Sequence, residues 1–161
     1  MLHHPKETKM REYYLEDFEI GQVFLSKSLV LDAESSKRFA AEFDPQPFHL
    51  DEEAARDSLF SGLAASGWHT AALTMKLLVD GGLPIAGGII GLGFDEFRWP
   101  QPVRPGDELR TESEILAVRE MKSQPDRGII KVRTVTLNQH DQAVQVNVGN
   151  ILALRRPERS S

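Results

Sequence analysis

The chain contains no cysteine among its 161 residues. This absence excludes disulfide bonds, a thiolate nucleophile and cysteine-ligated metal sites, and it is typical of a reducing compartment, so we expect a cytoplasmic protein. Long apolar runs are also missing, which predicts that no segment spans a membrane. The start of the chain, residues 1–11, is polar and lacks the apolar centre of a signal peptide, so we expect none.

Positive charge is scarcer than negative charge. The chain carries 19 Lys and Arg against 24 Asp and Glu, a formal net charge of −5. No stripe of basic residues could meet a phosphate backbone, so we expect no nucleic-acid partner. The length and a hydrophobic fraction of 40% predict one globular domain over residues 13–155, with a flexible tail at 1–12 and a second tail at 156–161.

The order of helical and strand patterns predicts an α+β fold. We expect a strand at 22–31, helices at 33–43, 52–57 and 68–80, and strands at 88–99, 108–120, 129–137 and 144–154. The helix at 68–80 is apolar enough to be buried, through a face made of Ala71, Ala72, Met75, Leu78 and Val79. This order predicts a long antiparallel sheet wrapped around a central buried helix. Such a sheet leaves an edge to be covered, so we expect a homodimer or higher homo-oligomer.

The most informative motif lies in Phe43–Asp51. Asp44 and His49 stand five positions apart, and Pro45 and Pro47 restrict the backbone between them. Asp and His can pass a proton near neutral pH, and a stiff loop suits a site that holds an acid and a base in one geometry. Simpler roles stay open, because Asp44 could merely turn the chain before proline and His49 could be a structural histidine.

Three segments, in the same order, resemble the MaoC-like dehydratases and (R)-specific enoyl-CoA hydratases. The segment Asp44–Ala55 is similar to the hydratase motif of that family. Leu63–Gly67 stands where the family opens its central helix, and Phe97–Leu109 resembles the segment in which a strand, a Pro-Val pair and a Gly-Asp pair lead into the next strand. Together the matches cover nearly the whole domain.

Within these segments Asp44, Pro47 and His49 match the family pattern, while Gln46 stands in place of Asn and Ser66 in place of His. The resemblance implies the hot-dog fold and a reaction that adds or removes water across the 2,3 double bond of an acyl thioester. It implies that Asp44 and His49 are the catalytic pair. It also implies a coenzyme A thioester as the substrate, with no cofactor and no metal.

The resemblance places Ser66, Gly67 and Trp68 at the oxyanion and substrate-binding position, where the central helix begins. A backbone N–H at a helix N-terminus can stabilise charge that develops on a thioester oxygen. Gly67 permits close approach because it has no side chain. The indole of Trp68 is expected to narrow the acyl pocket.

Two other functions stay open at this point. A hot-dog acyl-CoA thioesterase would use a carboxylate and the same helix N-terminus to hydrolyse the thioester, although the Asp-x4-His spacing favours a hydratase. A non-catalytic acyl-binding subunit is the other alternative, with Gln46 and Ser66 as signs of a decayed site.

Other candidate site residues have ordinary structural explanations. Trp68 and Trp99, taken alone, are more often core residues than ligand platforms, and His69 is expected to be a hydrogen-bonded polar group on the central helix. His49 and His69 are widely spaced and have no evident third ligand, so we expect no metal site.

Overall fold

The computed structural model describes residues 11–158. The tails predicted at 1–12 and 156–161 therefore lie largely outside the described residues. The elements, in chain order, are η1 (Leu15–Asp17), β1 (Val23–Val30), α1 (Ala33–Phe43), α2 (Pro47–Leu50), α3 (Glu52–Arg56), α4 (Gly67–Leu77), η2 (Leu78–Gly82), β2 (Ile90–Arg98), β3 (Glu108–Glu120), β4 (Arg127–Leu137) and β5 (Ala143–Leu154).

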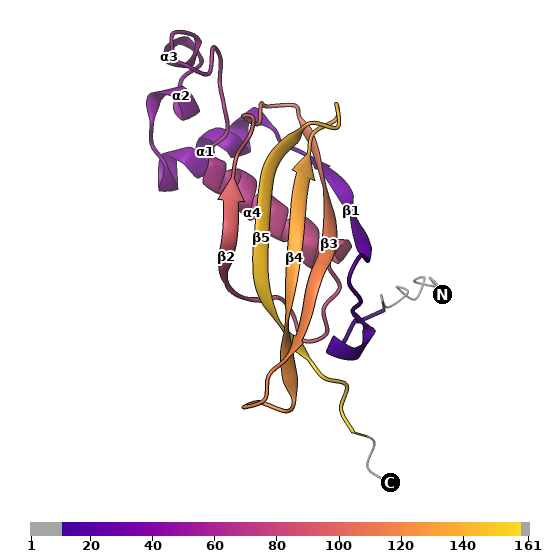
Figure 1. The fold of residues 1–161 in the computed structure, drawn as a ribbon. Helices are drawn as coiled ribbons and strands as arrows, with labels where there is room; N and C mark the ends of the chain where they lie inside the picture. The colour runs from indigo at the N-terminus through magenta and orange to yellow at the C-terminus, as the bar shows by residue number, and fades with distance from the viewer. Residues whose placement is uncertain (1–10, 159–161) are drawn as a thin grey trace, which may run out of the picture.

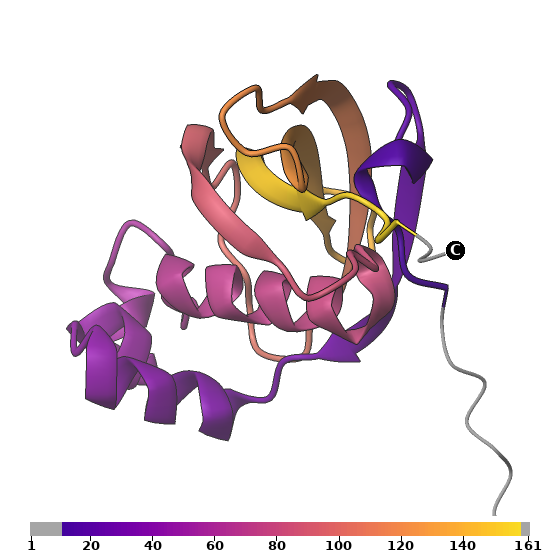
Figure 2. The same ribbon diagram turned by 90° about the horizontal axis from the view of Figure 1, so that it is seen from below.

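The five strands form one antiparallel sheet in the order β1-β3-β4-β5-β2. The sheet curves around α4, which runs along its concave side, while α1 to α3 gather at one end of the molecule (Figures 1 and 2). This arrangement confirms the predicted α+β hot-dog fold. It also sets the start of α4 next to the segment that carries the Asp–His motif.

Alternating side chains build the core between the sheet and α4. Ile115 of β3 and Ile130 and Val132 of β4 point inward and pack with Leu83, and all four are at most 2% exposed. Burial of such side chains contributes about 1.5–3 kcal/mol each, which fixes the register of the sheet around the helix.

The face that α4 turns to the sheet differs from the predicted one. Of the predicted apolar face Leu78 is buried, whereas Met75 and Val79 are 43% and 63% exposed. The sheet instead receives Thr74, whose Oγ1 lies 2.7 Å from Oγ1 of Thr136 in a buried hydrogen bond. Because Thr136 of β4 supplies a hydrogen-bonding partner, Thr74 can face the sheet without leaving its hydroxyl unpaired. Part of the predicted apolar face is consequently exposed on the outer side of the helix.

Large apolar side chains are exposed on the edge strand β2 and on the neighbouring helical segment. Ile90, Leu92 and Phe94 are 52–56% exposed, and Met75 of α4 and Val79 of η2 are 43% and 63% exposed. We call these five side chains the edge patch. Clustered apolar side chains on a strand with an unpaired edge are typical of an interaction surface.

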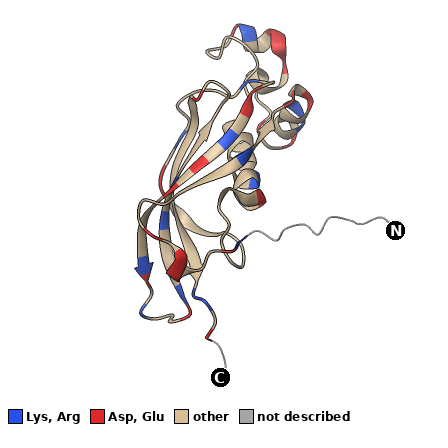
Figure 3. Ribbon diagram, turned by 90° about the vertical axis from the view of Figure 1, so that its right-hand side faces the viewer, with Lys and Arg blue, Asp and Glu red and all other residues tan. Residues whose placement is uncertain are grey.

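Charged residues are mixed over the rest of the molecule. Basic and acidic residues are interspersed along the strands and helices in Figure 3. Several form surface ion pairs, such as Arg110 with Glu112 and Lys76 with Asp80. No helix within residues 11–158 is long and apolar enough to cross a membrane.

Candidate active site

Asp44 and His49 are brought together by the junction of α1 and α2. Asp44 ends α1, where its backbone N–H donates to the carbonyl of Ala40. His49 lies on α2, a single helical turn, where the sequence predicted a loop. Proline is tolerated in the first turn of a helix, so Pro47 fits there. Nε2 of His49 lies 3.3 Å from Oδ2 of Asp44.

The orientation of the His49 ring is fixed by a hydrogen bond at Nδ1, the ring nitrogen that faces away from Asp44. Nδ1 lies 2.7 Å from the carbonyl oxygen of Ala64, and His49 is only 5% exposed. Because a carbonyl can only accept, Nδ1 carries a proton. In the neutral ring Nε2 is then an acceptor beside a carboxylate oxygen of Asp44. A water molecule that donates one proton to each would bridge the two.

Asp44 is held as a carboxylate by two donors. Nε2 of Gln46 donates to Oδ1 at 2.5 Å, and Oγ of Ser66 donates to Oδ2 at 2.7 Å. Burial acts to raise the pKa of Asp44, but these two hydrogen bonds and the nearby His49 outweigh it, so the pKa lies below its ordinary value of 3.8. Asp44 is therefore ionised at neutral pH.

Ser66 connects the carboxylate to the start of α4. Its side chain accepts from the N–H of Trp68 as the N-cap while donating to Asp44, and it is fully buried. The N–H groups of His69 and Thr70 are bonded to the Ser66 carbonyl. In this first turn, the N–H of Gly67 is left without a partner among residues 11–158, as is usual for helix starts.

A cavity of about 900 Å³, here called the dyad cavity, opens onto the site. It is lined by Asp44, His49 and Gly67, so these three predicted residues face one space, and also by Trp68 and Trp99. Ser66 is not among its lining residues. A Cβ at Gly67 would lie 2.7–2.9 Å from the Trp99 ring, which explains why a glycine stands there.

The two tryptophans are not core residues, contrary to the alternative considered from the sequence. Trp68 is 60% exposed and Trp99 is 39% exposed. Their rings meet edge to face at 5.3 Å. Trp68 lies in the first turn of α4, and Trp99 directly follows the end of β2. Both therefore lie at the rim of the dyad cavity and not beneath the sheet.

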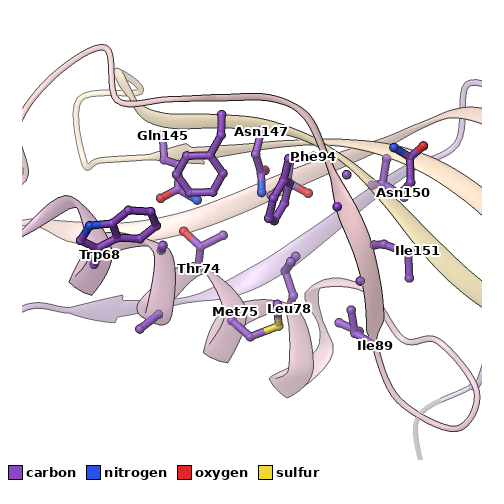
Figure 4. A pocket seen from close by; sticks show the side chains of 18 residues that line it. Trp68, Thr74, Met75, Leu78, Ile89, Phe94, Gln145, Asn147, Asn150 and Ile151 are labelled. Atoms are coloured by element: carbon purple, nitrogen blue, oxygen red, sulfur yellow. The ribbon is translucent and has the colours of Figure 1, made fainter. Parts of the chain in front are cut away.

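A second, smaller cavity of about 320 Å³ lies between α4 and the strands β2, β4 and β5, as Figure 4 shows. We call it the inner cavity. Trp68 lines both cavities and so stands between them.

Arg104 is a site-supporting residue that sequence reasoning missed. Its guanidinium donates to the carbonyls of Phe60, Gly62 and Leu63. The next carbonyl along this loop is that of Ala64, which orients His49. Nothing in the Pro-Val-Arg-Pro-Gly-Asp segment indicated this contact, because its partners lie about 40 positions away along the chain.

His69 differs from its expected hydrogen-bonded state. It stacks on Phe39 of α1 with ring centroids 4.6 Å apart, and its buried Nδ1 has no partner in the described part of the chain. Burial lowers the pKa of His69, against the opposing effect of the Asp32 carboxylate. His69 therefore packs α1 against α4 as a neutral ring and does not line the dyad cavity.

No group of three or more His, Cys, Asp and Glu side chains within residues 11–158 is arranged to hold a metal ion. The dyad cavity presents the Asp44 carboxylate and the His49 imidazole, and Gln46, Thr70 and Arg104 are also among its lining residues.

Residues 17–138 match the family model described as MaoC like domain. The chain belongs to the MaoC-like family. It is 55% identical to a MaoC-like dehydratase from Rhodospirillum rubrum, with a TM-score of 0.88 and 91% and 99% of the two chains covered. It is similar to the (R)-hydratase from A. caviae involved in PHA biosynthesis, at 29% identity and a TM-score of 0.68, with 88% and 99% covered.

Two curated proteins are also similar. The uncharacterized protein YdeM of Bacillus subtilis is 39% identical over 87% of this chain and 96% of its own length. The mesaconyl-CoA hydratase of Cereibacter sphaeroides is 40% identical over 42% of this chain, but the match spans only 20% of that protein.

The Arg104 contacts predict a specific loss. In Arg104→Met, the carbonyls of the 60–63 loop lose their donor, and we expect the free energy of unfolding to fall by about 1–3 kcal/mol. The His49 Nδ1 proton should exchange faster with solvent, as followed by NMR. Arg98→Met is the matched control, because among residues 11–158 the side chain of Arg98 pairs with Glu96 alone, at the surface. Equal effects of the two substitutions would contradict the supporting role of Arg104.

Proposed function

We propose that this chain is an enoyl-CoA hydratase or dehydratase, which adds or removes water across the 2,3 double bond of an acyl thioester. One observation carries the proposal. Nε2 of His49 and Oδ2 of Asp44 lie 3.3 Å apart on a cavity that also receives the start of α4 at Gly67. Membership of the MaoC-like family supports it, as do the hydratase names of similar proteins.

In the hydration direction the two side chains position and activate water. The ionised Asp44 and the lone pair on Nε2 of His49 each accept one hydrogen bond from the bridging water. As the water oxygen forms a bond to the β-carbon, His49 takes the proton at Nε2. The resulting imidazolium is stabilised by Asp44 and by the carbonyl of Ala64. His49 then returns a proton to the α-carbon, which completes the addition.

The start of α4 stabilises the charge that develops during this attack. The electron pair of the double bond moves toward the thioester oxygen, which becomes partly negative. The N–H of Gly67, with the helix dipole behind it, can donate to that oxygen. No step requires a metal or an organic cofactor, and the coenzyme A thioester is the substrate.

Substitution of the pair tests the proposal. Asp44→Asn and His49→Ala should each lower turnover of crotonyl-CoA by about 10²–10⁴-fold, the usual contribution of general acid–base catalysis. The measurement is loss of the enoyl absorbance. Asp57→Asn and His140→Ala, which lie outside the dyad cavity, are the controls.

The same assay separates the alternatives. Release of free thiol without loss of the enoyl group would indicate a thioesterase. Binding of the thioester without turnover would indicate an acyl-binding subunit. Full activity in either pair variant would remove the mechanism.

Trp68 is proposed to limit the acyl group, since it stands between the two cavities. A pocket wall discriminates each methylene by about 1–3 kcal/mol, so Trp68→Ala should broaden chain-length tolerance across a panel of enoyl thioesters. Its melting temperature should change little, because a side chain that is 60% exposed has little core packing to lose. Leu25→Ala, an exposed residue of β1, is the control. A lower melting temperature with an unchanged chain-length profile would contradict this role.

We further propose that the chain forms a homodimer through the edge patch, in the cytoplasm. Light scattering should give twice the 18.1 kDa mass of one chain. Leu92→Lys should favour the monomer, because it places a charge in the apolar interface. Val30→Lys is the control on the opposite edge strand, where Val30 is 63% exposed. A wild-type mass of one chain would reject the dimer.

A further inference from the structure

The inner cavity is lined largely by apolar side chains of α4 and β2, and three amide side chains of β5, Gln145, Asn147 and Asn150, also line it. Gln145 and Asn147 face it from the sheet, opposite Thr74 and Met75 of the helix (Figure 4). Both are buried, at 1% and 8% exposure. Two amides buried to this extent need hydrogen-bonding partners.

Asn147 lacks such a partner. Its Oδ1 is buried and accepts no hydrogen bond from the described residues. A buried polar atom left unpaired is destabilising by about 1–3 kcal/mol. The apolar fold therefore does not explain why an amide stands at this position, and a bound group that pairs with it would.

Gln145 is held in a defined orientation. Its Oε1 accepts from Nε1 of Trp99 at 3.0 Å. With Oε1 engaged in this way, the other end of the amide, Nε2, carries the N–H donors that can meet a bound group. Trp99 also lies against Gly67, so this bond links the amide to the proposed oxyanion position.

Other polar side chains that line the inner cavity already have partners. Thr74 is paired with Thr136, and Oγ1 of Thr134 lies 2.9 Å from Oγ of Ser113. Asn150 donates to Asp95. No charged side chain lines this cavity. The hydrogen-bonding groups that could meet a bound molecule in this cavity are therefore those of Gln145 and Asn147.

The inner cavity lies where the acyl end of the proposed substrate would extend. With its thioester oxygen at Gly67, an acyl group that passes Trp68 and follows α4 reaches Ala71 after about 6 Å, given a rise of 1.5 Å per residue. Trp68 and Ala71 both line the inner cavity.

Building on the proposed function, we infer that the preferred acyl group carries a polar oxygen beyond its double bond, and that Gln145 and Asn147 select it. A hydroxyl oxygen can accept from Nε2 of Gln145 while its proton is donated to Oδ1 of Asn147. A carboxylate oxygen can accept from Gln145 and from the amide nitrogen of Asn147. A plain hydrocarbon chain leaves both amides unpaired, and sites of this kind discriminate strongly against such analogues.

Substrate pairs of nearly equal shape test the inference with the wild-type chain. The hydroxyl pairs are 4-hydroxybut-2-enoyl-CoA with pent-2-enoyl-CoA, and 5-hydroxypent-2-enoyl-CoA with hex-2-enoyl-CoA. The carboxylate pair is fumaryl-CoA with 4-methylpent-2-enoyl-CoA. In at least one pair, kcat/KM for the oxygen-bearing substrate should be higher by about tenfold or more, as one good hydrogen bond provides. The pair that shows it identifies the source of the oxygen.

Asn147→Leu should abolish or reverse this preference while hydration of the hydrocarbon substrate is retained. Its melting temperature should not fall, because the substitution removes a buried Oδ1 that accepts no hydrogen bond from the described residues. Asn150→Leu is the matched control, since its amide is already bonded to Asp95, and the preference should persist.

The outcomes distinguish this inference from the proposed function. If no enoyl thioester is hydrated, the proposed function fails, and the inference fails with it. If the hydrocarbon substrates are hydrated as well as or better than their oxygen-bearing counterparts in every pair, the inference alone is overturned. It is also overturned if Asn147→Leu keeps the wild-type preference, or if it unfolds the protein while Gln145→Leu does not alter the preference.

Discussion

The hydroxyl of Ser66 is the contact on which the geometry of the site depends. It donates to Oδ2 of Asp44 and accepts from the N–H of Trp68, so one atom joins the end of α1 to the start of α4. The carboxylate and the helix N-terminus belong to segments more than twenty positions apart. Against the opposing effect of burial, the hydrogen bond from Ser66, together with that from Gln46, also lowers the pKa of Asp44, so the contact that positions the carboxylate also favours its charged form.

The imidazole is oriented by a second, independent chain of contacts. Arg104 holds the carbonyls of the 60–63 loop, and the loop presents the carbonyl of Ala64 to Nδ1 of His49. The carboxylate is thus held by side chains and the imidazole by backbone. Backbone carbonyls in a clamped loop have little freedom, so the ring nitrogen that faces Asp44 is set before any substrate arrives. This is the preorganisation that proton transfer requires.

Much of the fold followed from pattern. The helix at 33–43 and the strand at 108–120 were predicted at their observed bounds, because an N-cap, turn residues and alternation are local signals. The buried face of α4 was not predictable in this way. Thr74 is buried only because Thr136, sixty-two positions away, supplies its hydrogen bond. Which face of a helix meets the sheet is decided by such distant partners, which periodicity does not contain.

The residues of the site also differ in whether local sequence could predict them. Asp44, His49 and Gly67 could be proposed from the sequence, because a motif brings the first two together and a helix start marks the third. Arg104 could not, since its partners are backbone carbonyls that leave no trace in residue type.

Like Arg104, and unlike the Asp–His motif, the amides of the inner cavity could not be identified as site residues from the sequence. In β5 the sequence shows Val144, Val146 and Val148 alternating with polar residues, which reads as one face inward and one face toward water. In the structure Gln145 and Asn147 are buried too, because α4 and β2 enclose the face that they occupy. A strand buried on both faces normally carries apolar side chains on both. That β5 keeps amides on the face toward the cavity, one of them with an unpaired oxygen, sets a polar requirement on whatever fills that space.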